Sequence, residues 1–450
     1  MKLLLKGGRV LMPALKNEQA SEKSMDALLD VLIEDGRITA IGDNLSESDV
    51  DTVIQLKKEQ WVTPGLVDIH VHFRDPGQGS KETIATGALA AAAGGFTTVC
   101  MMPNTSPTID SVSVLEYVEQ AARKTKINVL TVPAVTKGLE GKELTAMGTL
   151  VSKGAVAFSD DGMPIESAGI MRKALEYAKM FGVAIVCHAE DPSLCGCGVM
   201  HEGYYSTRLG LPGIPSSAES TMVARDIELA RQTGGHVHFA HLSCKESVAL
   251  IRQAKKEGLN VTSETTPHNL ALTDATICDY DPNFKMYGPL RAADDQAALI
   301  EGILDGTIDA IATDHAPHTP EEKLLTFNEA PRGVIGLETS LGVILTHFYH
   351  SGKLSALDVV RLMSTAAAEC YGLKDAGILR QGMPADITVI DPELSWTVDP
   401  NRFFSKSKNC PFNGQTLQGK AILTIAKGEI VYDESGLLDG KNQAELLASV

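Results

Sequence analysis

Between residue 61 and residue 370 the chain alternates short apolar runs with amphipathic stretches. Each apolar run has the length of a buried strand, and a turn and a helical pattern follow it. Strands are expected to end near His70, Met102, Val132, Ser159, His188, His241, Ser263 and Thr313, with helices over 82–93, 111–123, 166–181, 217–233, 245–257 and 294–304. Repeated strand–helix units in a segment of this length predict an α/β fold, a TIM-like (β/α)8 barrel.

The two ends of the chain have another pattern, made of short strands joined by tight turns. Residues 31–41 form an Asp-Gly hairpin pattern with apolar arms, and 385–390 and 422–432 repeat this style near the other end. Neither half is large enough to bury a core alone. We therefore expect residues 1–60 and 371–450 to form one composite β domain, a small sandwich built from both termini, and residues 61–370 to form the barrel.

Composition excludes several classes of protein. The apolar fraction of 44% and the charged fraction of 22% are those of an ordinary globular protein. A formal net charge of -17 and the lack of a Lys- and Arg-rich run argue against nucleic acid as a partner. No segment has the length of a membrane span or the form of a signal peptide, and the eight cysteines lack the spacing of a disulfide framework. We expect a cytoplasmic protein with no membrane partner.

Side chains that bind metals stand where the expected barrel strands end. His70 and His72 close the first strand, and the alternation of side chains puts them on one face with Arg74. Closure of a barrel brings the carboxyl ends of all strands around one mouth, where the active sites of this fold lie. Other candidates at this end are Asn104, Asp160, Asp161, His188, His241, Asp314 and His318. Imidazoles and carboxylates suit Zn²⁺, so we expect a hydrolytic centre with two metal ions.

The motifs around these residues resemble those of the amidohydrolase superfamily and, within it, the bacterial dihydroorotases that use an aspartate as the bridging ligand. The motifs are DIHVHFRDPG at 68–77, MPNT at 102–105, SDDG at 159–162, CHAED at 187–191, AHLS at 240–243, TDHAPH at 313–318 and RGVIGLET at 332–339. They occur in the family's order through the whole barrel. The RDPG and PNT motifs resemble those of dihydroorotases. Hydantoinases and allantoinases share only the metal-binding residues with this pattern.

The resemblance implies the reversible closure of N-carbamoyl-L-aspartate to L-dihydroorotate, a step of pyrimidine biosynthesis, with one or two Zn²⁺ per subunit. His70 and His72 would bind one zinc, and His188 and His241 the second. Many relatives bridge the metals with a carbamylated lysine, but Lys153 precedes the fourth strand and falls at the wrong end of the barrel. Asp161, or less favourably Asp160, is therefore expected to bridge. Asp314 would ligate the first zinc and act as the catalytic general acid and base.

The substrate-binding set implied by the resemblance consists of His72, Arg74, Asn104, Tyr287, His318, Arg332 and Gly333. One member departs from the family pattern, which has Asn at the position of Tyr287. That Asn helps to hold the substrate ring, so either the tyrosine hydroxyl reaches the ring from further away or the loop 283–291 sits differently. Either this loop or the segment 318–332 could move to cover the substrate.

Two other functions stay open. An allantoinase or a dihydropyrimidinase would share the metal framework but act on a ring without a carboxylate, which leaves Arg74 and Asn104 with less to hold. A non-catalytic relative would serve as an assembly subunit, but such relatives lose metal ligands and none is lost here. The expected partners are a small anionic substrate and a second copy of the chain in a homodimer, with possible association with aspartate transcarbamoylase.

Overall fold

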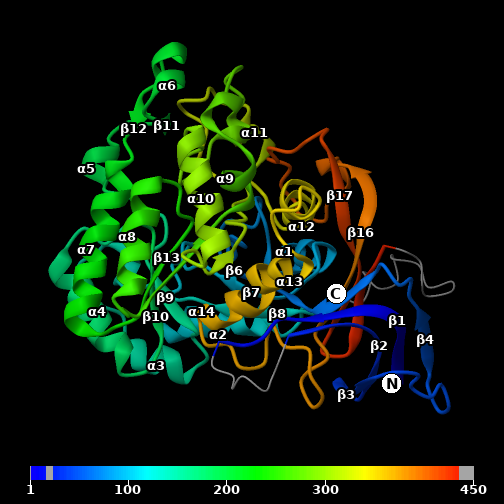
Figure 1. The fold of residues 1–450 in the computed structure, drawn as a ribbon. Helices are drawn as coiled ribbons and strands as arrows, with labels where there is room; N and C mark the ends of the chain where they lie inside the picture. Colours follow the sequence, from blue (N-terminus) through cyan, green and yellow to red (C-terminus); the bar gives the residue numbers. More distant parts are fainter. Residues whose placement is uncertain (1, 17–23, 435–450) are drawn as a thin grey trace.

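A computed structural model describes residues 2–16 and 24–434, and its central feature is a closed barrel of parallel strands (Figure 1). The barrel strands are β6 (Leu66–Val71), β7 (Phe96–Met101), β8 (Asn128–Thr131), β9 (Ala157–Ser159), β10 (Ala184–Cys187), β13 (Val237–Phe239), β14 (Val261–Thr265) and β15 (Ala310–Ile311). They form two hydrogen-bonded sheets, β6-β7-β8 and β9-β10-β13-β14-β15. The two sheets are joined at both seams, because Val156 N donates to Thr131 O at 3.2 Å and His72 N to His315 O at 2.8 Å. The predicted (β/α)8 barrel is confirmed.

The helices predicted between the strands are present. They are α1 (Ile84–Ala93), α2 (Val112–Ala122), α4 (Ala168–Lys179), α7 (Ser217–Thr233), α8 (Lys245–Lys256) and α10 (Ala293–Asp305), with the shorter α3 (Met147–Ser152) before β9. The α8 helix shows why: Val248, Ile251 and Ala254 recur every three residues and are buried. No helix within 2–16 and 24–434 is both long and apolar enough to cross a bilayer.

Shorter elements complete the barrel. At the carboxyl ends of the strands and in the loops beyond them lie α5 (Pro192–Cys195), β11 (Met200–His201), α6 (Tyr204–Leu209), β12 (Gly213–Ile214), α9 (Pro267–Ala271) and α11 (Pro320–Lys323). After the last strand come α12 (Ser340–Ile344), α13 (Ala356–Val360) and α14 (Ala366–Cys370).

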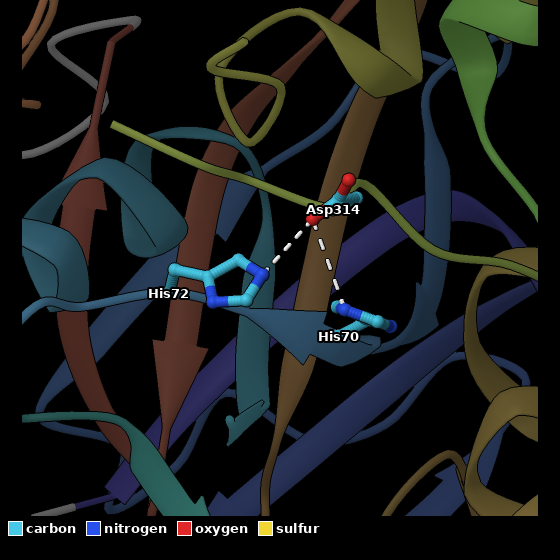
Figure 2. Close-up of side chains that lie close together, drawn as sticks. All are labelled: His70, His72 and Asp314. Carbon is cyan, nitrogen blue, oxygen red and sulfur yellow. Dashed lines mark hydrogen bonds and ion pairs between the residues drawn. The ribbon is translucent and has the colours of Figure 1, made fainter. Parts of the chain in front are cut away.

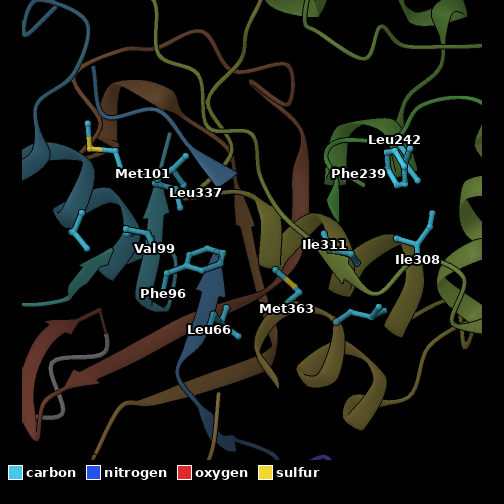
Figure 3. Close-up of a cluster of buried hydrophobic side chains, with 14 of the residues drawn as sticks. Leu66, Phe96, Val99, Met101, Phe239, Leu242, Ile308, Ile311, Leu337 and Met363 are labelled. Atoms are coloured by element: carbon cyan, nitrogen blue, oxygen red, sulfur yellow. The ribbon is translucent and has the colours of Figure 1, made fainter. Parts of the chain in front are cut away.

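Two apolar layers hold the barrel. The outer layer packs strand residues such as Leu66, Phe96 and Val99 against the surrounding helices, and Figure 3 shows part of it. The inner layer fills the barrel with small side chains at the strand starts, including Ala157, Ala184 and Ala310, which pack with α14 and with Tyr371 after it. The amino-terminal end of the barrel is therefore closed by packed side chains, and space for a ligand is left at the carboxyl end.

Strands from both chain termini form the second unit, and one of them, Trp61–Pro64, lies in the range 61–370 that was expected to belong to the barrel. They are β1 (Lys2–Met12), β2 (Met25–Glu34), β3 (Arg37–Gly42), β4 (Thr52–Gln55), β5 (Trp61–Pro64), β16 (Ile387–Thr397), β17 (Thr416–Ala426) and β18 (Glu429–Asp433). Their order is β18-β17-β16-β5-β1-β2-β3, with β4 also paired to β1. The β2–β3 hairpin turns at Asp35 and Gly36, which both have positive φ. Figure 1 shows the strands of both ends side by side. Buried side chains from both ends form one cluster, so each end supplies core that the other lacks.

Candidate active site

A cavity of about 540 Å³ opens at the carboxyl ends of the barrel strands. Among the residues that line it are His72, Arg74, Asn104, Asp161, His188, His241, Tyr287, Asp314, His318 and Arg332, all of them candidates from the sequence. His70 lies just beneath the cavity floor and is fully buried. Gly333 follows Arg332 with φ +135°, where an added Cβ would lie 3.0 Å from His318 Nε2. The fold therefore gathers the candidate residues around one space.

His70, His72 and Asp314 form the first group on the cavity floor. Figure 2 shows both imidazoles directed at the carboxylate of Asp314. His72 Nε2 lies 3.0 Å from Asp314 Oδ1, and His70 Nε2 lies 3.7 Å from the same oxygen. One ligand atom from each of these residues lies within 4.8 Å of the other two, so the group could hold a metal ion.

Asp161 is the centre of a second group. Its Oδ1 lies 3.3 Å from His70 Nε2 and 3.5 Å from both His188 Nδ1 and His241 Nε2, while its Oδ2 lies 3.4 Å from His72 Nε2. The neighbouring carboxylate points elsewhere, since Asp160 accepts hydrogen bonds from the backbone N and the hydroxyl of Thr136. Asp161 thus touches every imidazole of the cluster, and Asp160 touches none.

The polar atoms of this cluster fit a cation. Among the described residues, His70 Nε2 and Asp161 Oδ1, which face each other in this cluster, are buried and make no hydrogen bond. A buried polar atom without a partner costs about 1–3 kcal/mol, which a bound metal would offset. Imidazole nitrogens and carboxylate oxygens are the donors that Zn²⁺ takes in proteins.

Electrostatics keep the carboxylates ionised. Burial works to raise the pKa of Asp314, but the His72 hydrogen bond and the charges of His70 and His72 outweigh it and lower the pKa to about 2. The same opposition holds the pKa of Asp161 well below its usual range, with His70 as the main lowering influence. Burial acts to lower the pKa of His70, and the carboxylates of Asp161 and Glu264 raise it well above its usual range. The cluster is therefore a dense set of carboxylates and imidazoles that stabilise one another's charged forms.

The backbone is strained where it delivers these side chains. Arg74, His241 and Asp314 have φ of 60°, 35° and 45°, in the left-handed region that non-glycine residues rarely adopt. Each follows the end of a barrel strand, and the turn redirects its side chain into the mouth. Such strain is concentrated at functional sites, because the surrounding packing holds it in place.

Cationic groups line one side of the cavity. Arg74 is 8% exposed, and Nε is its one nitrogen with a hydrogen-bond partner in the described chain, Pro317 O at 3.3 Å. Both Nη groups are thus free to bind a ligand. Arg332 is neutralised instead, because its Nη1 lies 3.0 Å from Glu190 Oε1 and its Nη2 donates to Gly198 O. Arg74 therefore offers free guanidinium donors to the cavity, whereas those of Arg332 are already taken.

Comparison with known proteins places the chain. Residues 59–247 match a family model described as dihydro-orotase-like. A dihydroorotase of Pelotomaculum thermopropionicum is 48% identical over 434 residues, 96% of this chain and 99% of that protein. One of Citrifermentans bemidjiense is 48% identical over 433 residues, 96% of this chain and 100% of that protein. The chain belongs to the dihydroorotase family. The resemblance found in its motifs is confirmed.

Solved structures with the same fold come from a neighbouring group. An L-hydantoinase (dihydropyrimidinase) from Arthrobacter aurescens matches with a TM-score of 0.85 and 26% identity, over 96% of both chains. A dihydropyrimidinase from Brevibacillus agri matches with a TM-score of 0.82 and 23% identity, over 96% of this chain and 95% of that one, which shows the fold alone. Dihydroorotases and hydantoinases are cyclic-amide hydrolases, and this dihydroorotase-family chain is an enzyme of that class.

Polar residues behind the histidine–aspartate cluster of this dihydroorotase-family chain form a second layer, of which only Asn104 was among the predicted site residues. Glu264, on β14, is fully buried, and its Oε1 lies 2.8 Å from His70 Nδ1 while its Oε2 lies 3.2 Å from His238 Nε2. His238 in turn contacts Thr262 Oγ1 at 2.9 Å. On the other side, Asn104 Oδ1 lies 2.8 Å from His72 Nδ1. Such partners fix the ring orientation of an imidazole ligand. A carboxylate inside an otherwise buried strand was the signal available for Glu264.

Tyr287, the departure from the family pattern, stands against the imidazole cluster. Its ring meets the His188 ring edge-on at 4.8 Å between centroids, and the guanidinium of Arg332 lies over it at 4.8 Å. Gly288 has φ +55°, and an added Cβ would come 2.8 Å from His241 O, so the chain passes close over the cluster only with glycine there. Tyr287 and Arg332 thus form one stacked wall of the cavity.

Proposed function

We propose that this chain catalyses the reversible closure of N-carbamoyl-L-aspartate to L-dihydroorotate. The observation that carries the proposal is Arg74, a buried guanidinium with both Nη groups free, on the wall of the cavity above the histidine–aspartate cluster. A guanidinium is the side chain best suited to hold a carboxylate. Dihydroorotate carries a carboxylate on its ring, and hydantoin, allantoin and dihydrouracil do not.

The proposed metal is zinc, one or two ions per subunit. His70, His72 and Asp314 would hold the first ion and His188 and His241 the second, with Asp161 between them because it faces both sets. Zinc bound there would supply Lewis acidity, which lowers the pKa of a ligated water towards about 7 and polarises a carbonyl. Asp161 and Asp314 would balance most of the added charge, and Arg74 keeps the site attractive to an anion.

Asp314 is the proposed acid and base. In the ring-opening direction a water oxygen bonds to the ring carbonyl carbon, and the C–N bond of the cyclic amide breaks. Asp314 takes a proton from the attacking water and returns it to the departing nitrogen. Its low pKa leaves it ionised and ready to accept that proton. In the closing direction the carbamoyl nitrogen bonds to the carbon of the side-chain carboxyl group and a water molecule leaves. Asp314 then carries the proton from that nitrogen to the departing oxygen.

The proposed grip on the substrate carboxylate combines Arg74, Asn104 and His318. The Nδ2 of Asn104 is available as a donor because its oxygen faces His72. His318 Nε2 donates to Arg332 O at 2.9 Å in the free protein, and substrate binding would exchange this bond for one to the carboxylate. Carbonyl oxygens accept two hydrogen bonds, so those of Arg332 and Gly333 can also accept the ring N–H groups. Tyr287 would lie against the opposite face of the substrate ring.

Three further expectations extend this proposal beyond the single chain. The enzyme would work in the cytoplasm, at the ring-closing step of pyrimidine biosynthesis. A homodimer and an association with aspartate transcarbamoylase rest on the family resemblance. Light scattering of the purified chain, alone and mixed with that partner, would test both.

Metal analysis joined to a substrate panel tests the proposal. Purified protein should hold one or two zinc ions per chain and interconvert carbamoyl aspartate and dihydroorotate. Activity on dihydrouracil, hydantoin and allantoin should be far lower. Turnover of a ring without a carboxylate at the rate of dihydroorotate would overturn the substrate assignment but keep the reaction class. A zinc-loaded protein that acts on none of these rings would overturn both.

A further inference from the structure

Two lysines beside the cavity are buried without a matching acid. Lys285 is 4% exposed and Lys323 is 8% exposed. Lysine is almost never buried to this degree unless its charge is paired. Within the described chain neither ammonium lies within ion-pair distance of a carboxylate, so their charges must be satisfied in another way.

Main-chain carbonyls satisfy both ammonium groups. Lys285 Nζ donates to Phe327 O at 2.7 Å, Asn328 O at 3.0 Å and Ala330 O at 2.7 Å. Lys323 Nζ donates to Pro282 O at 2.9 Å, Lys285 O at 3.3 Å and Pro331 O at 2.9 Å. An ammonium has three protons, so each lysine uses all of them on carbonyls.

These contacts tie together the two loops of the cavity wall. One loop, 282–288, carries Tyr287, and the other, 327–333, carries Arg332 and Gly333. Gly333 N also donates to Lys285 O at 2.9 Å, so that carbonyl accepts one hydrogen bond from Lys323 Nζ and one from the backbone of the second loop. Three carbonyl dipoles converging on one point repel one another unless a cation lies between them. The ammonium groups are therefore what allows this loop path.

We propose that Lys285 and Lys323 are positioning residues: two protonated clamps that hold the loops 282–288 and 327–333 in the arrangement that binds substrate. The claim about substrate rests on the proposed function, whereas the claim about the loops does not. Because the two lysines hold the loops in the binding arrangement before substrate arrives, less conformational entropy is lost on binding than if a mobile loop had to close over the substrate.

The clamps also predict a response to alkaline pH. Burial, with the charge of Arg332, lowers the pKa of Lys285 to about 8, and burial, with the charge of Lys285, lowers that of Lys323 to about 7. A depressed lysine pKa means that the proton is present at low pH and lost as pH rises through these values. A neutral amine has one donor fewer and turns a lone pair towards a carbonyl. The charged or titratable groups that face the pair are Arg332, Asp281, Glu322 and His318.

Hydrogen–deuterium exchange tests the loop claim without substrate. In Lys285→Met and Lys323→Met, exchange of the peptide that spans 327–334 should quicken by at least about tenfold, because hydrogen bonds to a charged donor are lost. Lys179→Met is the control, since Lys179 also donates to a carbonyl, Thr233 O at 2.8 Å, but far from the cavity. Exchange at 327–334 that matches the wild type in both variants would overturn the proposal. If Lys285→Met does not fold, Lys285→Gln, which keeps two donors without the charge, is measured instead.

Steady-state kinetics then test the link to substrate. In either variant KM for dihydroorotate should rise by at least about tenfold with kcat changed by less than about threefold, since the groups lost act on binding and not on the reacting atoms. In the wild type KM should rise as pH passes through about 7 to 8, where Lys323 and then Lys285 lose their protons, and in Lys285→Met it should be high at all pH values. A fall in kcat of at least about tenfold with an unchanged KM would overturn the positioning role. If the wild type is inactive on dihydroorotate but exchange at 327–334 is faster in the variants, the proposed function is wrong and the role of the two lysines in holding the loops still stands.

Discussion

The floor and the wall of the cavity are built in different ways. The floor, with His70, His188, His241 and Asp314, is made of residues at the ends of barrel strands, where closure of the sheet leaves little choice of position. The wall, with Tyr287 and Arg332, is carried by loops whose path depends on two lysines and on main-chain carbonyls. The floor is thus set by the fold, while the loops of the wall are set by local contacts. In the proposed function the floor carries the chemistry shared with hydantoinases, and the loops help Arg74 to position the substrate.

Asp314→Asn should have the largest effect, because it removes the proton carrier and leaves the floor in place. We expect kcat to fall by about 10²–10⁴-fold, the usual contribution of a general acid and base. Metal content should stay close to that of the wild type, because Asp161 and the four imidazoles that it faces are unchanged. Wild-type turnover in this variant would show that the proton is carried by another group.

A matched pair of neighbours tests which carboxylate serves the floor. Asp161→Asn should lose metal and activity together, because Asp161 faces four imidazoles. Asp160→Asn should keep the metal and lose some thermal stability, since Asp160 accepts its bonds from Thr136. Metal analysis and thermal unfolding of both proteins give the answer, and the reverse outcome would make Asp160 the bridging ligand.

Arg74→Ala should affect binding, not chemistry. A hydrogen-bonded charge contributes about 1.5–3 kcal/mol, so KM for dihydroorotate should rise by about 10- to 100-fold with a small change in kcat. Arg332→Ala is the comparison, and its effect on KM should be smaller because Glu190 already neutralises that guanidinium. Equal effects of the two substitutions would contradict the assignment of the substrate carboxylate to the free Nη groups of Arg74.

Glu264→Gln tests the layer behind the floor. Loss of a carboxylate that orients an imidazole ligand typically weakens metal binding by about 10- to 100-fold. Competition with a chelator measures this directly, and one metal equivalent should leave more easily than the other because Glu264 contacts His70 alone among the proposed ligands. Glu119→Gln, in a half-buried contact with Thr131, is a control that should leave both equivalents unchanged.

Tyr287→Asn, which restores the family residue in the wall, should have the smallest effect. The ring stacks on Arg332 and meets His188, so its loss frees Arg332 to move while the floor stays intact. We expect KM to change by less than about tenfold, in line with the modest energy of such ring contacts. A fall in kcat as large as that of Asp314→Asn would show that Tyr287 acts on the reacting atoms.

The difference between the strand-end floor and the loop-borne wall also explains which parts of the site could be predicted from the sequence. The strands and helices of the barrel, and the ligand-type residues at the strand ends, follow from apolar periodicity and from the rule that parallel strands end at one rim. Glu264 escaped because it lies inside a strand that was expected to end at Ser263. Lys285 and Lys323 were not predicted, because a lysine that donates to main-chain carbonyls has no recognisable spacing in the sequence. Its partners are known only from the path of the folded loops.

The β-sheet made from both termini has a consequence for how the protein is made. The β5 strand pairs with β1 on one side and with β16 on the other. A nascent chain on the ribosome therefore exposes an unfinished sheet edge at β5 while more than 300 residues of barrel are still emerging. Any folding of the barrel during synthesis takes place beside that open edge, which β16 covers once it has emerged.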